Sequence, residues 1–323
     1  MTAAEIRGAF VIAAEQAGGT VAAAVRALAG GAEALSWRAA KELCVAGRVA
    51  VDGHPAIDPA ARVEEGQRLT IGEHAAEPAH RILVHIDSAL VVADKPPGVL
   101  TTPVERTDRG TLLHLAAVEV RRHDARKGIQ GSPSLRAVQR LDRDTSGLLV
   151  FARTVTAERH LQAQLKSRTV WRRYLALVHG HAVAGTYSTH LMADRGDGLR
   201  GSWERLRREP GEKPPVSAKP AVTHVTVERQ FRDATLVSCR LETGRQHQIR
   251  IHLSEAGTPL LGEPIYVRGS WLKGAKERAR RPMLHAVELG FVHPGTRKEL
   301  RFAAEPPPDF ARLLATLERS DSV

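Results

Sequence analysis

The chain is poor in the residues on which several common kinds of site depend. Only two of its 323 residues are cysteines, Cys44 and Cys239, and they lie far apart without a CxxC partner. A cysteine-only zinc site is therefore excluded, and a disulfide between them is not expected. No apolar run approaches the roughly 20 residues of a membrane-spanning helix, and residues 1–10 lack a signal-peptide core. We therefore expect a cytoplasmic protein without a membrane segment.

Histidine is plentiful, at 15 residues, but its spacing does not predict a metal site. The densest stretch, His247 to His252, reads HQIRIH rather than HExxH, and its arginines repel a cation. We expect neither a metal ion nor another cofactor.

Positive charge is in excess and unevenly distributed. Lys and Arg number 47 against 36 Asp and Glu, which gives a net charge of +11. Residues 1–80 hold seven basic and ten acidic residues, a net −3, so residues 81–323 carry +14. A strongly basic chain favours a polyanionic partner, most often nucleic acid. The simpler alternative is a well-solvated surface.

The sequence divides into a small first part and a large second part. The polar, proline-containing stretch at 74–81 indicates a linker, so we predict domains at 1–73 and 82–323. In the first, residues 35–46 have helical apolar spacing that includes Trp37, with Ser36 as N-cap and Gly47 as the stop. A strand, an Asp52-Gly53 turn and a second strand at 63–71 follow. This order resembles the S4 RNA-binding module and implies a small α/β RNA-binding domain.

Strands and helices are intermixed in the second part. Strands are predicted at 147–152, 171–178, 221–229 and 235–241, with two more within 82–94, and helices at 111–120, 156–167 and 247–257. The Gly- and Arg-rich segment 195–213 is expected to be a solvated loop. The absence of regular βαβ spacing favours an α+β fold.

The most informative stretch is AVQRLDRDTSGLLVFA, residues 137–152. It places Arg140, Asp142, Arg143 and Asp144 within five residues, next to an apolar strand. The simpler interpretation is a charged turn before a core strand. The functional interpretation needs an isolated acid held by a cation.

Six motifs in order resemble the RluA-type pseudouridine synthases. The segment RLDRDTSGLL resembles the active-site motif of that family. The others are DKPPG at 94–98, WRRYLALVHG at 171–180, KPAVTHVTVERQ at 219–230, TGRQHQIRIHLSEAGTPLLGEPIY at 243–266 and PMLHA at 282–286. The resemblance covers about residues 82–310. It implies a mixed, mainly antiparallel central sheet with flanking helices, and an isomerase acting on structured RNA. With the S4-like part, the layout is RluC/RluD-like.

The resemblance also implies roles for individual residues. Asp142 matches the catalytic aspartate, Tyr174 the tyrosine that stacks on uracil, and Arg250 the arginine paired with the aspartate. In substrate binding, Arg140 matches the arginine that fills the space left by the flipped base, and Leu284 lies in the segment that packs the base. Further RNA or scaffold contacts are expected from Arg245, His247 and Lys95.

The chemistry agrees with a single reactive carboxylate. Uridine must lose its N1–C1′ bond, rotate and rejoin through C5, without a redox step. An acid can attack C6 or C1′, or remove the 2′ proton, and the sequence leaves these routes open. An arginine at contact distance favours the ionised acid. Because a base inside a duplex is out of reach, the enzyme must extrude it, at a few kcal/mol, and the basic second part supplies attraction to phosphate.

One departure and two alternatives accompany this prediction. Gln139 stands where the family has histidine, which leaves open a catalytically silent RNA-binding or ribosome-assembly protein. A two-carboxylate hydrolase built on Asp142 and Asp144 is disfavoured, because residues two apart in an extended turn point to opposite faces. We expect a monomer, and the S4-like layout favours ribosomal RNA over transfer RNA as the substrate.

Overall fold

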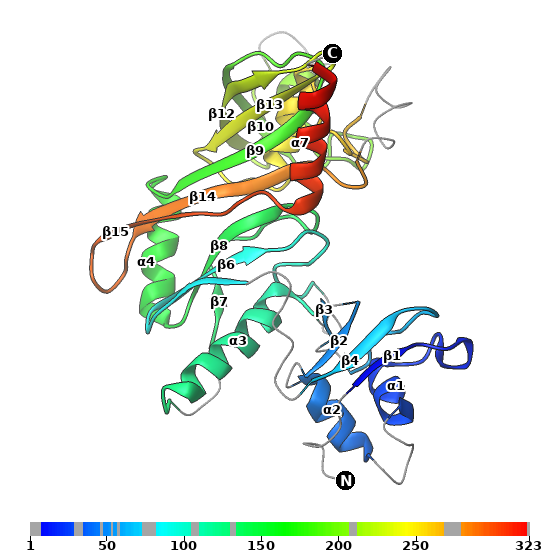
Figure 1. Cartoon of the computed structure of the whole chain (residues 1–323). Helices are drawn as coiled ribbons and strands as arrows, with labels where there is room; N and C mark the ends of the chain where they lie inside the picture. The colour runs from blue at the N-terminus through cyan, green and yellow to red at the C-terminus, as the bar shows by residue number, and fades with distance from the viewer. Residues whose placement is uncertain are drawn as a thin grey trace. The chain divides into compact units, whose positions relative to one another are not determined.

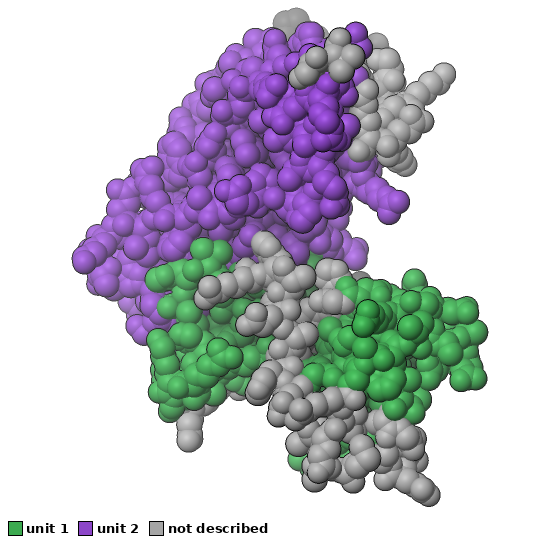
Figure 2. Space-filling view, viewed as in Figure 1, with its two compact units in different colours: residues 1–86, 99–135 green, residues 87–98, 136–323 purple. Residues whose placement is uncertain are grey.

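The chain forms two compact units, shown in Figure 2. In this computed structural model the described residues are 8–28, 35–45, 48–52, 54–56, 59–72, 82–104, 110–129, 134–206, 212–267 and 279–321. The first unit comprises residues 1–86 and 99–135, and the second comprises 87–98 and 136–323. The bounds predicted from the sequence, 1–73 and 82–323, stay a prediction, and the expected linker at 74–81 lies outside the described residues.

The first unit contains a small four-stranded sheet of order β1-β4-β2-β3 with two helices (Figure 1). Its elements are β1 (Gly8–Val11), η1 (Ala14–Gln16), α1 (Val21–Leu28), α2 (Trp37–Val45), β2 (Val49–Val51), β3 (His54–Pro55) and β4 (Arg68–Ile71). The Ser36 hydroxyl accepts a hydrogen bond from the Ala39 amide at 3.1 Å, as a helix cap does. Cys44 is buried, but Trp37 is 47% exposed, so its predicted place on the apolar face is wrong. Its ring lies against the Arg26 guanidinium, 4.8 Å away. The expected helix stop, Gly47, lies outside the described residues.

The first unit also holds β5 (Leu83–Ile86) and α3 (Leu112–Arg126). Helix α3 begins at Leu112, one residue after the predicted start at Thr111, and continues past residue 120 to Arg126. Its buried positions Leu112, Ala116 and Val120 recur at helical spacing, which explains why the pattern was recognisable.

The second unit is built on one large sheet of order β11-β10-β12-β13-β9-β14-β8-β6. Strand β15 pairs with β14 and β7 with β8. The pairings recorded within this unit are antiparallel except β14 with β8, so the mixed, mainly antiparallel sheet is confirmed. The strands are β6 (Leu90–Lys95), β7 (Arg136–Ala137), β8 (Ser146–Ala152), β9 (Trp171–His179), β10 (Gly185–Met192), β11 (Gly201–Ser202), β12 (Lys219–Gln230), β13 (Ala234–Leu241), β14 (Leu284–Val292) and β15 (Glu299–Ala303).

Helices pack against this sheet (Figure 1). Helix α4 (Val155–Lys166) packs Leu161 into a core with residues of β6, β8 and β14. Helix α7 (Pro308–Asp321) packs Phe310 and Leu317 into a core with Leu177 of β9. Helix α5 (Gln248–Glu255) buries Ile251 with residues of β10 and β12.

Two local predictions need correction. The cap of α4 is Thr154, whose hydroxyl accepts from the Ala157 amide at 3.1 Å, so the helix begins one residue before the predicted Thr156. The segment 195–213 is not solvated throughout, because Ser202 of β11 and Trp203 of the following turn η2 (Trp203–Arg205) are buried. Within the described ranges, no helix is long and apolar enough to cross a membrane.

Candidate active site

The loop that carries Asp142 lies between β7 and β8 and is held by two buried basic side chains. The Lys95 Nζ donates to the carbonyl oxygen of Arg143 at 2.7 Å. The Arg281 Nη1 donates to the carbonyl oxygen of Asp144 at 2.9 Å. Two consecutive carbonyl groups thus each accept a hydrogen bond from a side chain distant in the sequence. These bonds constrain the backbone next to Asp142.

The sheet immediately after this loop needs glycine. Gly147 has φ +107°, and a Cβ atom there would lie 2.3 Å from the Ala286 carbonyl oxygen. Gly147 and Ala286 are register partners in the parallel pairing of β8 with β14. The glycine of the TSGLL segment therefore lets β14 approach the strand that follows Asp142.

The Asp142 carboxylate meets two residues from the start of α5. Its Oδ2 lies 3.7 Å from Arg250 Nη1 and 3.9 Å from His247 Nε2. The Asp142 side chain is 25% exposed, whereas that of Arg250 is only 7% exposed. The structure thus brings together three of the predicted site residues and leaves the carboxylate open to solvent.

Arg250 has a second and closer acidic partner, Glu263. Its Nε donates to Glu263 Oε2 at 2.8 Å and its Nη2 donates to Oε1 at 2.6 Å. Burial lowers the pKa of Arg250, but the hydrogen bonds and negative charge of Glu263 outweigh burial and raise that pKa above its ordinary value. Glu263 was not among the predicted site residues. It stands in the quoted segment LLGEPIY, and that segment was the one signal that could have found it.

His247 is held in an unusual backbone conformation. It caps α5 with φ 58° and ψ 18°, in the left-handed region that non-glycine residues rarely adopt. Its Nδ1 lies 2.7 Å from the Tyr266 hydroxyl, which fixes the ring. Burial lowers the pKa of His247, with Asp142 opposing and Arg250 adding to the shift, so the imidazole is neutral at pH 7. Such strain at a candidate site is consistent with a functional constraint.

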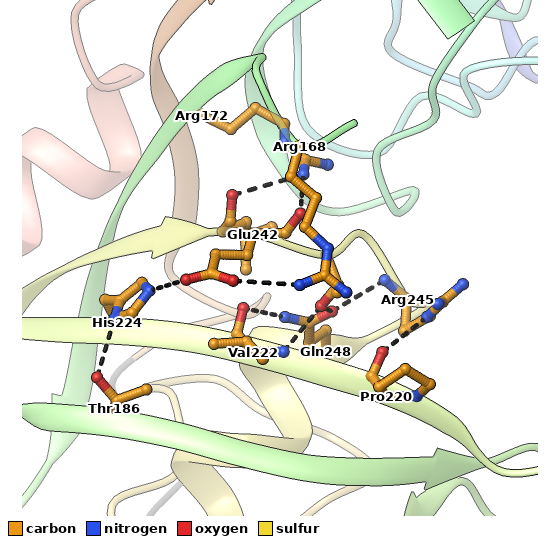
Figure 3. A network of polar contacts seen from close by, with 11 residues as sticks. Arg168, Arg172, Thr186, Pro220, Val222, His224, Glu242, Arg245 and Gln248 are labelled. Carbon is orange, nitrogen blue, oxygen red and sulfur yellow. Dashed lines mark hydrogen bonds and ion pairs between the residues drawn. The ribbon is translucent and has the colours of Figure 1, made fainter. Parts of the chain in front are cut away.

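A network of polar contacts fixes the turn that leads into α5 (Figure 3). Gln248 accepts at Oε1 from the Thr243 hydroxyl and the Arg245 amide, and its Nε2 donates to the Val222 carbonyl. The Arg172 Nη2 donates to the Glu242 carbonyl oxygen at 3.1 Å. The network joins β9, β12 and the end of β13, so the position of α5 is set by the sheet.

Two further predicted residues lie on neighbouring strands. Tyr174 of β9 is the register partner of Ala286 in β14, and Leu284 is the partner of Ala176. Burial raises the pKa of Tyr174, Arg172 opposes the shift, and Asp142 adds to it. The tyrosine is therefore neutral and lies within electrostatic reach of the candidate carboxylate.

The remaining predicted contacts differ in their surroundings. Arg140 is exposed at the start of the loop. Arg245 is exposed, and its Nε donates to the Pro220 carbonyl oxygen at 3.1 Å. Lys95 is fully buried, and burial lowers its pKa to about 7. Because Lys95 is buried, its position suits holding the loop better than the substrate binding expected from the sequence. Gln139 is half-buried just before the loop.

Comparisons with known proteins agree on one family. The family described as RNA pseudouridylate synthase matches residues 89–255. A ribosomal large subunit pseudouridine synthase D from Zymomonas mobilis is 35% identical over 305 residues, which cover 90% of this chain and 92% of that protein. A protein from Bacillus subtilis named uncharacterized RNA pseudouridine synthase YlyB is 34% identical over 283 residues, covering 85% of this chain and 87% of that protein.

Solved structures show the same fold. The structure titled human RNA pseudouridylate synthase domain containing 4 has a TM-score of 0.60 and 24% identity, and covers 74% of this chain and 93% of that chain. The curated relatives support an isomerase and not the catalytically silent alternative. The chain belongs to the RNA pseudouridylate synthase family.

Proposed function

We propose that this RNA pseudouridine synthase converts uridine to pseudouridine in large-subunit ribosomal RNA, with Asp142 as the catalytic carboxylate. The observation that carries the proposal is the position of Asp142. It is partly exposed, on a fixed loop, 3.7 Å from the buried guanidinium of Arg250. The choice of RNA rests on the names of the relatives, several of which are ribosomal large subunit pseudouridine synthases D.

The remaining predicted residues have roles that fit their positions. Tyr174 and Leu284 supply an aromatic ring and an apolar side chain on adjacent strands, which suits packing of an extruded pyrimidine. Arg140 is exposed and positively charged beside the carboxylate loop, where it can enter a duplex. Residues 81–323, with their net +14, provide attraction to phosphate. RNA binding by the S4-like part, a monomeric state and a cytoplasmic location belong to the same proposal.

The reaction needs one acid and no net proton change. The N1–C1′ bond breaks, a C1′–C5 bond forms, the proton on C5 is lost and N1 gains a proton. Asp142 can act as nucleophile or as base in this sequence. His247 and Tyr174 are neutral. Of the two basic side chains within 4 Å of the Asp142 carboxylate in the described part of the chain, His247 and Arg250, only Arg250 therefore carries a positive charge.

The test is the variant Asp142→Asn on transcribed large-subunit ribosomal RNA, with pseudouridines mapped chemically along the RNA. We expect loss of pseudouridine formation with RNA affinity changed less than about threefold, because the amide preserves shape but cannot act as nucleophile or base. The matched control is Asp197→Asn, whose carboxylate is exposed and pairs with Arg195. Equal turnover by wild type and Asp142→Asn would remove the assigned role, and transfer RNA as the better substrate would remove the choice of RNA.

A further inference from the structure

Two carboxylates share one arginine at the centre of the site. Arg250 presents three nitrogen atoms, and Glu263 accepts from two of them, Nε and Nη2, at 2.8 and 2.6 Å. The third nitrogen, Nη1, faces Asp142 at 3.7 Å, which is longer than a hydrogen bond. The arginine is therefore committed mainly to the acid that lies deeper in the protein.

We infer that Glu263 is a positioning residue that withholds Arg250 from a full ion pair with Asp142, and so keeps the catalytic carboxylate reactive. This inference rests on the proposed role of Asp142. The Glu263 side chain has no exposed surface, so it cannot touch RNA and acts through the residues that it holds, above all Arg250.

The surroundings of Glu263 show how firmly it is placed. Its Oε1 accepts from the backbone amides of Ile265 and Tyr266 at 3.0 and 3.2 Å, in addition to Arg250. The Tyr266 ring lies 5.3 Å from the Arg250 guanidinium carbon and its hydroxyl meets His247. One turn after Gly262 thus fixes both side chains that face Asp142.

The physical reason for such an arrangement is differential binding. A bidentate arginine pair with Asp142 would stabilise the resting carboxylate as much as its reacting form, and uniform stabilisation does not accelerate a reaction. Bidentate arginine–carboxylate pairs are also the strongest of the common ion pairs. With two nitrogens occupied by Glu263, Arg250 supplies charge near Asp142 without enclosing it.

The central variant is Glu263→Gln, which keeps the size of the side chain. Its amide oxygen can still accept from the two backbone amides, but its amide nitrogen faces the Arg250 Nε–H, so two donors meet and the arginine is released toward Asp142. We expect kcat to fall at least tenfold with KM changed less than twofold. Glu263→Asp, which keeps the charge, should recover part of the loss. The control Glu255→Gln alters a carboxylate of α5, the helix that carries Arg250. That carboxylate accepts from the Ser202 amide, and its loss should leave both constants unchanged.

A spectroscopic cycle tests the geometry without relying on catalysis. The Nε–H resonance of Arg250, assigned with Arg250→Lys, is recorded with and without Asp142→Asn in the wild-type and Glu263→Gln backgrounds. Because Nε is committed to Glu263 in the wild type, we expect Asp142→Asn to move this resonance at least twice as far in the Glu263→Gln background. If Glu263→Gln does not fold, Glu263→Asp replaces it, since a shorter carboxylate also releases one nitrogen.

The possible outcomes separate the two proposals. An equal or smaller resonance shift in the Glu263 variant, or a wild-type kcat in it, overturns the inference while an inactive Asp142→Asn leaves the proposed function standing. An active Asp142→Asn overturns the proposed function, and with it the purpose assigned to Glu263, even if the resonance cycle behaves as expected.

Discussion

The buried lysine beneath the catalytic loop predicts a specific dependence of stability on pH. Burial lowers the pKa of Lys95 from 10.5 to about 7. That difference corresponds to about 5 kcal/mol between the charged and neutral forms in the folded chain. At pH values between about 7 and 10.5, the unfolded chain binds more protons at this residue than the folded chain, so the folded state gains stability as the pH rises.

The perturbation that isolates this contribution is Lys95→Met, which removes the titrating group and keeps an unbranched side chain. The free energy of unfolding of the wild type, minus that of the variant, should increase by about 2 kcal/mol from pH 7 to pH 9. Urea denaturation of both proteins at several pH values between about 6 and 9 measures it. Subtraction cancels the titration of all other groups that behave alike in the two proteins.

The control is Lys166→Met, which removes a lysine at the exposed last turn of α4. Lys95→Met should also reduce kcat, because the carbonyl oxygens of Pro96 and Arg143 lose their donor. A difference between wild type and Lys95→Met that stays flat across this pH range would refute the assignment of a strongly desolvated lysine.

Three other expectations concern the same site. Arg140→Ala should slow turnover more on structured RNA than on single-stranded RNA, and an equal effect on both in kinetic assays would argue against insertion into a duplex. Gly147→Ala should lower the free energy of unfolding by at least about 2 kcal/mol, from a positive φ and a clash with backbone, whereas Gly185→Ala, with open space at its Cβ, should change it little. Asp309→Asn should lower it by about 2 kcal/mol at pH 7, because the buried Arg281 loses a carboxylate that is 38% exposed. Burial raises the pKa of Asp309, but the hydrogen bond and charge of Arg281 outweigh burial and lower that pKa, so the loss should shrink in denaturation curves as the pH falls below about 4.

Much of the sheet was predictable because its strands alternate or are continuously apolar. Strand β9 was expected at 171–178 and ends at His179, and β8 was expected at 147–152 and begins at Ser146. The pairing of Asp142 with Arg250 was expected only from the resemblance to the pseudouridine synthase family. Nothing in residue spacing shows that segments so far apart meet, so the family resemblance supplied this contact and local pattern did not.

The parts that were missed depend on tertiary contacts. Glu263 follows a glycine and precedes a proline, a composition typical of an exposed turn. It is nevertheless buried, and its carboxylate is paired with Arg250. Trp203 lies in a Gly- and Arg-rich segment and is nevertheless buried. Trp37 shows the reverse, since helical spacing placed it on the apolar face and the fold leaves it exposed. Local sequence patterns predict the usual burial of a residue type, whereas the burial of these three residues is decided by their tertiary contacts.

The parallel junction of β14 with β8 also bears on when a newly made chain becomes active. The Ser146 hydroxyl contacts the ring of His285 across this junction at 3.0 Å, and the two residues are separated by 139 positions in sequence. Pairings between distant segments form late, because the entropic cost of closing a long loop comes before the stabilising contacts can form. During translation, the strand that follows the aspartate loop therefore cannot pair with β14 until β14 has left the ribosome. A nascent chain that ends short of β14 should be inactive, however well its earlier strands have folded.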